Sequence, residues 1–83
     1  MTVPDDDPGI AELGPQQREF FEAHRRAFTV GEHCAKKVYQ VTWRDGTVVD
    51  GFRARDGDGH YAHSLRRIVT LAMRIGEGGL LRP

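Results

Sequence analysis

The sequence predicts an α+β domain in which two helices cover one face of an antiparallel sheet, in helix–β-hairpin–helix order. Two observations predict this two-layer fold. Residues 38–54 hold two runs rich in β-branched and aromatic residues around Asp45-Gly46, and Asp-Gly is typical of a two-residue hairpin turn because both turn positions need positive φ. Residues 15–28 and 60–75 place apolar side chains three and four positions apart, which is the period of an amphipathic helix.

The two ends of the chain are expected to lie outside the packed domain, which then spans residues 15–76. Residues 1–14 combine the Asp5-Asp6-Asp7 run with proline and glycine, a composition typical of a disordered acidic tail. Such a tail could compete with an anionic ligand for the basic half of the chain. Residues 77–83 are expected to form a flexible tail, with Leu80 and Leu81 able to fold back.

The first helix is predicted from Pro15 to Phe28. Proline suits the first helical position, and Gly31 is a plausible stop for the helix. The apolar stripe of this helix consists of Leu13, Phe20, Phe21, His24, Ala27 and Phe28.

The hairpin register follows from the predicted turn. Counting back from Asp45-Gly46 places Trp43 opposite Val48 and Tyr39 opposite Phe52, with all four side chains on one face. We expect this aromatic face to lie beneath the helices, because a two-stranded ribbon is not stable alone. A third strand from residues 31–35 is an additional option.

The second helix is predicted from His60 to about Ile75, with Asp58 as its cap and Gly76 as its end. Its apolar stripe consists of Tyr61, Leu65, Ile68, Val69, Ala72 and Ile75.

Composition and charge exclude several classes of protein. No apolar run approaches the ~18–20 residues that span a bilayer, and the acidic first residues lack the apolar region of a signal peptide. One cysteine, Cys34, predicts a cytoplasmic, reducing setting. Residues 1–35 hold three basic and seven acidic side chains, a net charge of −4, and residues 36–83 hold nine basic and five acidic ones, a net charge of +4. This asymmetry is compatible with an anionic partner for the second half of the chain, and also with two halves of one fold that attract each other.

Candidate chemistry is sparse. His60 and His63 have a ligand-like spacing, and His33-Cys34 could complete a metal set, but adjacent His-Cys is not a familiar zinc-ligand spacing. Exposed histidines on a polar helix face account for these residues more simply than a metal site does. We therefore expect no metal, no cofactor and no enzymatic activity.

The strongest functional candidate is a basic surface. Several basic side chains recur along the polar side of the second helix, and others lie on the strands around the hairpin. Arginine suits phosphate and carboxylate because its planar fork donates two hydrogen bonds at once, although a charged outer face is also typical of any soluble helix. The candidate binding residues are His63, Arg66, Arg67, Arg74, Lys36, Lys37, Arg53 and Arg55.

Two functions are consistent with this surface. The first is a small regulator or inhibitor that binds another protein, of the kind that phages and plasmids carry as modulators. The second is a nucleic-acid-binding module that uses the basic stripe of the second helix; over residues 15–76 the order of elements resembles the layout of double-stranded-RNA-binding domains, and layout alone does not imply function. The thin core also favours a homodimer.

Overall fold

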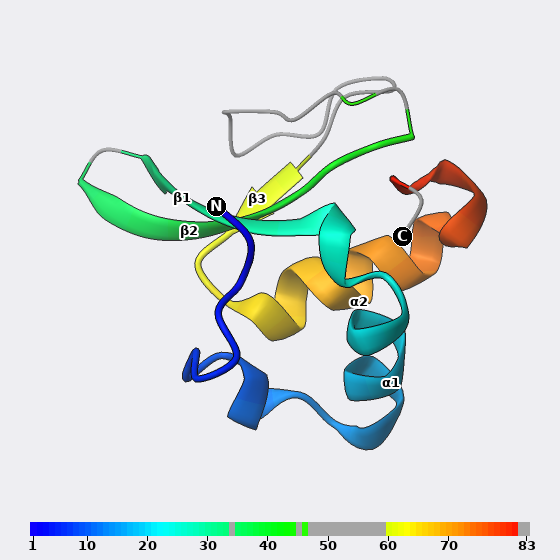
Figure 1. Ribbon diagram of the computed structural model, residues 1–83, viewed down its shortest axis with the longest axis horizontal. Coiled ribbons are helices and arrows are strands. Elements are labelled where there is room, and N and C mark those ends of the chain that lie inside the picture. Colours follow the sequence, from blue (N-terminus) through cyan, green and yellow to red (C-terminus); the bar gives the residue numbers. More distant parts are fainter. Residues whose placement is uncertain (34, 45, 47–59, 82–83) are drawn as a thin grey trace.

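A three-stranded antiparallel sheet is covered on one side by two helices (Figure 1). The computed structural model describes residues 1–33, 35–44, 46 and 60–81. The strands lie in the order β1-β2-β3, with β2 in the middle. This arrangement confirms the predicted α+β fold class. In chain order the elements are η1 (Ile10–Glu12), α1 (Pro15–Ala23), η2 (Arg25–Ala27), β1 (Phe28–His33), β2 (Lys36–Val41), β3 (His60–Ala62), α2 (Leu65–Ile75) and η3 (Glu77–Gly79), where η denotes a 3-10 turn.

The hairpin of the sheet joins β1 to β2, earlier in the chain than predicted. Its register runs from Phe28 opposite Val41 to His33 opposite Lys36. On its other side, β2 pairs with β3 from residue 39 to residue 41. Both edges of β2 are therefore used within the sheet.

The predicted pairing of Tyr39 with Phe52 is wrong, because Tyr39 lies between Val30 on β1 and Ala62 on β3. The chain does turn near the predicted position: the Gly46 N–H donates a 2.9 Å hydrogen bond to the carbonyl of residue 43, and Gly46 has φ +89°. The predicted return strand, including the partner of Trp43, falls within residues 47–59, outside the described residues.

Helix α1 begins at Pro15 as predicted but ends at Ala23 rather than at Phe28. A 3-10 turn follows, and Phe28 is the first residue of β1. Gly31, predicted to stop the helix, lies inside β1. The apolar spacing of the helix continues through Phe28, but alternation of Phe28 and Val30 with polar Thr29 fits a strand equally well, and pairing with β2 decides between the two.

Helix α2 begins at Leu65 rather than at His60 and ends at Gly76 as predicted, where φ is +90°. The predicted helix includes the three residues of β3 because Tyr61 continues its apolar spacing. They pair with β2 instead, and the chain enters the helix through Ser64, in extended conformation. Neither helix among the described residues is long and apolar enough to cross a bilayer.

The core lies between the sheet and the helices. Tyr39, Val41 and Trp43 alternate along the chain and belong to one buried cluster, so the predicted aromatic face beneath the helices is confirmed for Tyr39 and Trp43. Trp43 retains 8% of its surface exposed. Helix α2 contributes the largest buried stripe, made of Leu65, Ile68, Val69 and Ala72.

Both terminal segments pack onto this core, which differs from the expected tails. Val3 and Ile10 belong to the buried cluster. Leu80 is 1% exposed and bridges to Trp43, and the Leu81 N–H donates to the Thr42 carbonyl at 3.1 Å. The packed unit is therefore wider than residues 15–76, because apolar side chains near both ends reach the sheet.

Candidate functional site

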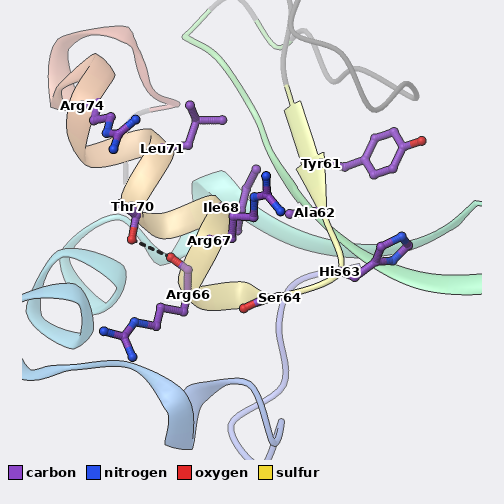
Figure 2. Close-up of a pocket in the computed structure, with 10 residues that line it drawn as sticks. All are labelled: Tyr61, Ala62, His63, Ser64, Arg66, Arg67, Ile68, Thr70, Leu71 and Arg74. Atoms are coloured by element: carbon purple, nitrogen blue, oxygen red, sulfur yellow. Dashed lines mark hydrogen bonds between the residues drawn. The ribbon is translucent and has the colours of Figure 1, made fainter.

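An open groove lies between β3 and α2, with a volume of about 910 Å³ (Figure 2). Its lining combines two kinds of side chain. Leu71 is half-buried and supplies apolar surface, with buried Ala62 and Ile68 beneath it, whereas four basic side chains are exposed. The lining residues are Tyr61, Ala62, His63, Ser64, Arg66, Arg67, Ile68, Thr70, Leu71 and Arg74.

Helical spacing places the basic side chains along this groove. Arg67, Leu71 and Arg74 follow one another at i, i+4 and i+7, so they share one side of α2. Figure 2 shows Arg67 extending toward β3, while Arg66 extends toward α1. The groove therefore has cations at intervals along its helical wall.

A second, shallower hollow of about 670 Å³ lies on the α1 side of the same helix. Arg66, Thr70 and Arg74 line both hollows, so these residues form a ridge between them. Thr70 is held firmly: its hydroxyl donates to the Arg66 carbonyl at 2.8 Å and accepts a 3.1 Å hydrogen bond from Nε2 of Gln17. Thr70 thus connects the first turn of α1 to α2.

The arginines of α2 lack carboxylate partners within the described chain. Ion pairs among the described residues use Arg18, Arg25 and Lys37. By contrast, Arg66, Arg67 and Arg74 form no such pair and lie exposed at the surface. The described lining of the groove also contains no aspartate or glutamate. An anionic ligand would therefore meet no internal competitor from these residues.

Other predicted binding residues lie elsewhere. Lys36 is exposed at the turn end of β2, and Lys37 is directed toward Asp7; neither lines the described groove. Arg53 and Arg55 lie outside the described residues. The structure thus groups the four predicted residues that follow β3 or lie on α2, and leaves the two lysines of β2 outside the groove.

A buried polar cluster around Asp7 was not anticipated from the sequence. The Asp7 side chain is 2% exposed, and Lys37 Nζ lies 2.5 Å from its Oδ1. The Tyr39 hydroxyl and the Gly9 N–H donate to Oδ2 at 2.7 and 2.8 Å. Only one sequence signal existed: Lys37 and Tyr39 are two apart on one strand and must share a face.

The Asp7 cluster shifts three titrations. Burial by itself raises the pKa of Asp7, but hydrogen bonds from Lys37, Tyr39 and the Gly9 N–H outweigh it, so the pKa lies below 3.8. The hydrogen bond to Asp7 raises the pKa of Lys37 above 10.5. Burial, and then the hydrogen bond to Asp7, raise the pKa of Tyr39 above 10.0. The Asp7 carboxylate is thus the acceptor for both the Lys37 ammonium group and the Tyr39 hydroxyl.

The metal hypothesis receives no support from the described residues, which contain no group of three His, Cys, Asp or Glu able to hold an ion. Nδ1 of His63 lies 3.2 Å from the Lys37 carbonyl. Cys34 and the side chains of His33 and His60 lie outside the description, so a set that includes them stays a prediction.

Chemically, the groove offers guanidinium donors next to apolar surface. Guanidinium groups bind carboxylates and phosphates through paired hydrogen bonds, and the apolar members can contact aliphatic or aromatic side chains. No protein family, curated protein or solved structure matches this chain.

Proposed function

We propose that this protein is a small non-enzymatic regulator or inhibitor that binds an acidic segment of another protein in the groove between β3 and α2. The observation that carries the proposal is the exposure of Arg66, Arg67 and Arg74 without carboxylate partners among the described residues. These arginines stand beside the apolar side chains of Ile68 and Leu71.

The mixed lining supports a protein partner. A carboxylate can accept two hydrogen bonds from one guanidinium, and arginine loses less freedom than lysine for each hydrogen bond formed. The exposed part of the Leu71 side chain would be covered by an apolar side chain of the same segment. Interfaces of this kind take affinity from desolvated apolar contacts and orientation from charge.

Nucleic-acid binding is the second candidate, because the same three arginines could contact phosphates. Between Arg66 and Arg74 the helix rises only about 12 Å at ~1.5 Å per residue, so the stripe spans few phosphates. The chain has no net charge and a pI near 6.9, whereas dedicated nucleic-acid-binding domains are usually basic. These properties favour the protein partner.

Charge reversal on α2 tests the proposal. The chain is immobilised, a partner is captured from extract of the native host and identified, and its affinity for the purified protein is measured by calorimetry. We expect the double variant Arg67→Glu/Arg74→Glu to bind this partner about thirtyfold more weakly or worse, as loss of two charged contacts implies, with an unchanged melting temperature. The matched control is Arg26→Glu/Arg44→Glu, which changes net charge equally at exposed positions away from the described groove lining. Equal affinity of both double variants would remove the groove as the site.

Salt dependence distinguishes the second candidate. A labelled 20-nucleotide RNA or DNA is titrated at several salt concentrations, and the logarithm of affinity is plotted against the logarithm of salt concentration. Phosphate contacts predict a steep slope that becomes shallower by about one for each arginine removed. We expect weak binding that the double variant leaves unchanged; a steep slope that falls by about two in that variant would establish nucleic acid as the ligand instead.

A further inference from the structure

Residues 1–9, here called the arm, begin at the edge of β1 and then pass beneath the sheet on its helix side (Figure 1). Thr2 forms an antiparallel bridge with Thr29, and the Val30 N–H donates a 2.7 Å hydrogen bond to the Met1 carbonyl. Val3 is only 2% exposed and belongs to the core. The arm then turns, where the Asp7 N–H donates to the Pro4 carbonyl at 3.1 Å, so Met1 and Thr2 make the backbone contact with β1 and Val3 is an apolar anchor beside it.

Two cations hold the acidic side chains of the arm. The Arg25 guanidinium donates to the Val3 carbonyl at 3.2 Å and lies 2.6 Å from Oδ1 of Asp5. Asp5 is 95% exposed, so this pair contributes little. The ion pair between Lys37 and buried Asp7 is the stronger contact, and Lys37 Nζ also lies 5.0 Å from the Tyr39 ring centroid.

Three residues of the arm are buried against this surface. These are Val3, Asp7 and Gly9, whereas Pro4, Asp5, Asp6 and Pro8 are exposed. A Cβ on Gly9 would lie 2.7 Å from the Tyr39 hydroxyl oxygen and 2.9 Å from Cβ of Leu65, so the surface accepts only glycine there without adjustment. The arm is thus held at Val3, Asp7 and Gly9 by burial, charge and close packing.

We propose that the edge of β1, with Arg25, Lys37 and Tyr39, is a binding site for an acidic peptide, and that the arm occupies it as a built-in ligand. A partner protein that presents a similar segment would bind by displacing the arm. This site shares no described residue with the lining of the groove between β3 and α2, so it does not rest on the function proposed above.

Displacement of the arm can be measured on the full chain. The probe is a synthetic peptide of residues 1–12, labelled at its C-terminal end, and its binding is followed by fluorescence anisotropy. In the unmodified chain the tethered arm competes at an effective concentration on the order of millimolar, so the probe should bind poorly. Asp7→Asn and Val3→Ala each weaken the arm while keeping Arg25, Lys37 and Tyr39 intact, and each should bind the probe at least about tenfold more tightly.

The specificity of the probe provides the control. A peptide carrying Asp7→Asn should lose about thirtyfold or more in affinity for the Val3→Ala chain, because it lacks the anion that Lys37 binds. A peptide carrying Asp6→Asn has the same net charge as the Asp7→Asn peptide but is changed at an exposed position. Its affinity should lie within about twofold of that of the unmodified probe. Adding Lys37→Ala to the Val3→Ala chain should abolish the tighter binding of the probe that Val3→Ala produces.

Several results would overturn the proposal. One is a folded Asp7→Asn or Val3→Ala chain that binds the probe no better than the unmodified chain does. Another is an equal loss of affinity for the Asp6→Asn and Asp7→Asn peptides, which would mean that the peptide binds through nonspecific charge attraction. Unfolding of both chain variants, followed by circular dichroism, would also count against it, because the arm would then be inseparable from the fold.

Discussion

The hydroxyl of Tyr39 donates a 2.7 Å hydrogen bond to Oδ2 of Asp7, which lies 32 positions earlier in the chain. Lys37 contacts the other oxygen of the same carboxylate, so β2 holds the N-terminal segment through two residues that share one face of the strand. A carboxylate that is 2% exposed is stable only when its hydrogen bonds are satisfied. This contact therefore makes an acidic, proline-rich segment part of the folded domain.

Replacement of Asp7 by alanine should lower the free energy of unfolding by about 2–4 kcal/mol, because it leaves the Tyr39 hydroxyl and the Gly9 N–H without their acceptor. Urea denaturation followed by circular dichroism measures this change. The control is Asp6→Ala, at an exposed position in the same aspartate run, which should change stability by no more than about 0.5 kcal/mol. Equal effects of the two replacements would show that Asp7 contributes only its charge.

At acidic pH the stability of the folded chain should depend on the ionisation of Asp7. Its pKa in the folded chain lies below 3.8, so the unfolded chain takes up the proton first as pH falls. The stabilisation is therefore complete above the unfolded pKa and is lost as pH falls through the folded pKa. In urea titrations at a series of pH values, the stability difference between the unmodified chain and Asp7→Asn should be constant near neutrality and should narrow below about pH 4. A difference that stays constant to low pH would contradict the assigned shift.

At alkaline pH the same cluster should again lose its contribution to stability, this time because Lys37 loses its proton. The pKa of Lys37 is raised above 10.5, chiefly by its hydrogen bond to Asp7. This stabilisation is complete below the unfolded pKa and is lost as pH rises through the folded pKa. Lys37→Met keeps the apolar stem but removes the charge, so its stability should approach that of the unmodified chain only at strongly alkaline pH. If the difference in stability between the two chains persists at strongly alkaline pH, the stability that Lys37→Met loses comes from packing rather than from charge.

Trp43 and Leu80 should be coupled in stability. Trp43→Ala should cost about 3–5 kcal/mol and Leu80→Ala about 2–5 kcal/mol, as truncations of buried side chains do. The two residues bridge and share the core, so the double variant should cost less than the sum of the single ones. Denaturation of all four chains measures the coupling energy. Additive losses would mean that η3 and the residues after it pack independently of Trp43.

Gly9→Ala should destabilise the chain by about 1–3 kcal/mol, because its Cβ would lie within 2.9 Å of three atoms, including the Tyr39 hydroxyl oxygen and Cβ of Leu65. The matched control is Gly78→Ala, where a Cβ would meet nothing within 4 Å. Melting temperatures of the two variants provide the test. A Gly9→Ala chain as stable as Gly78→Ala would show that the arm shifts to accommodate a methyl group.

Local sequence patterns were sufficient to predict the fold class and several limits of its elements. The apolar period predicted the buried stripe of α2 correctly for residues 65–72, but not for Tyr61, which lies in β3, or for Ile75, which is 43% exposed. Proline at residue 15 and glycine at residue 76 marked the outer ends of the two helices. The alternation of Tyr39 with Trp43 identified the side of β2 that faces the core. The same helical spacing placed Arg67 and Arg74 on one exposed side of α2. Each of these features depends only on residues within a few positions of one another.

Pairing between distant segments decided the rest. Phe28 and Tyr61 each continue the apolar spacing of a neighbouring helix. Both lie in strands because β1, which precedes β2 in the chain, and β3, which follows it, pair with the two edges of β2. Likewise, nothing near Asp7 could reveal that its carboxylate is satisfied 30 and 32 positions later by Lys37 and Tyr39. The sequence by itself determined which faces are apolar and which are charged. The tertiary structure decided which of those faces meet, because the free energy of a strand pair or a buried ion pair belongs to both partners and is absent from either segment alone.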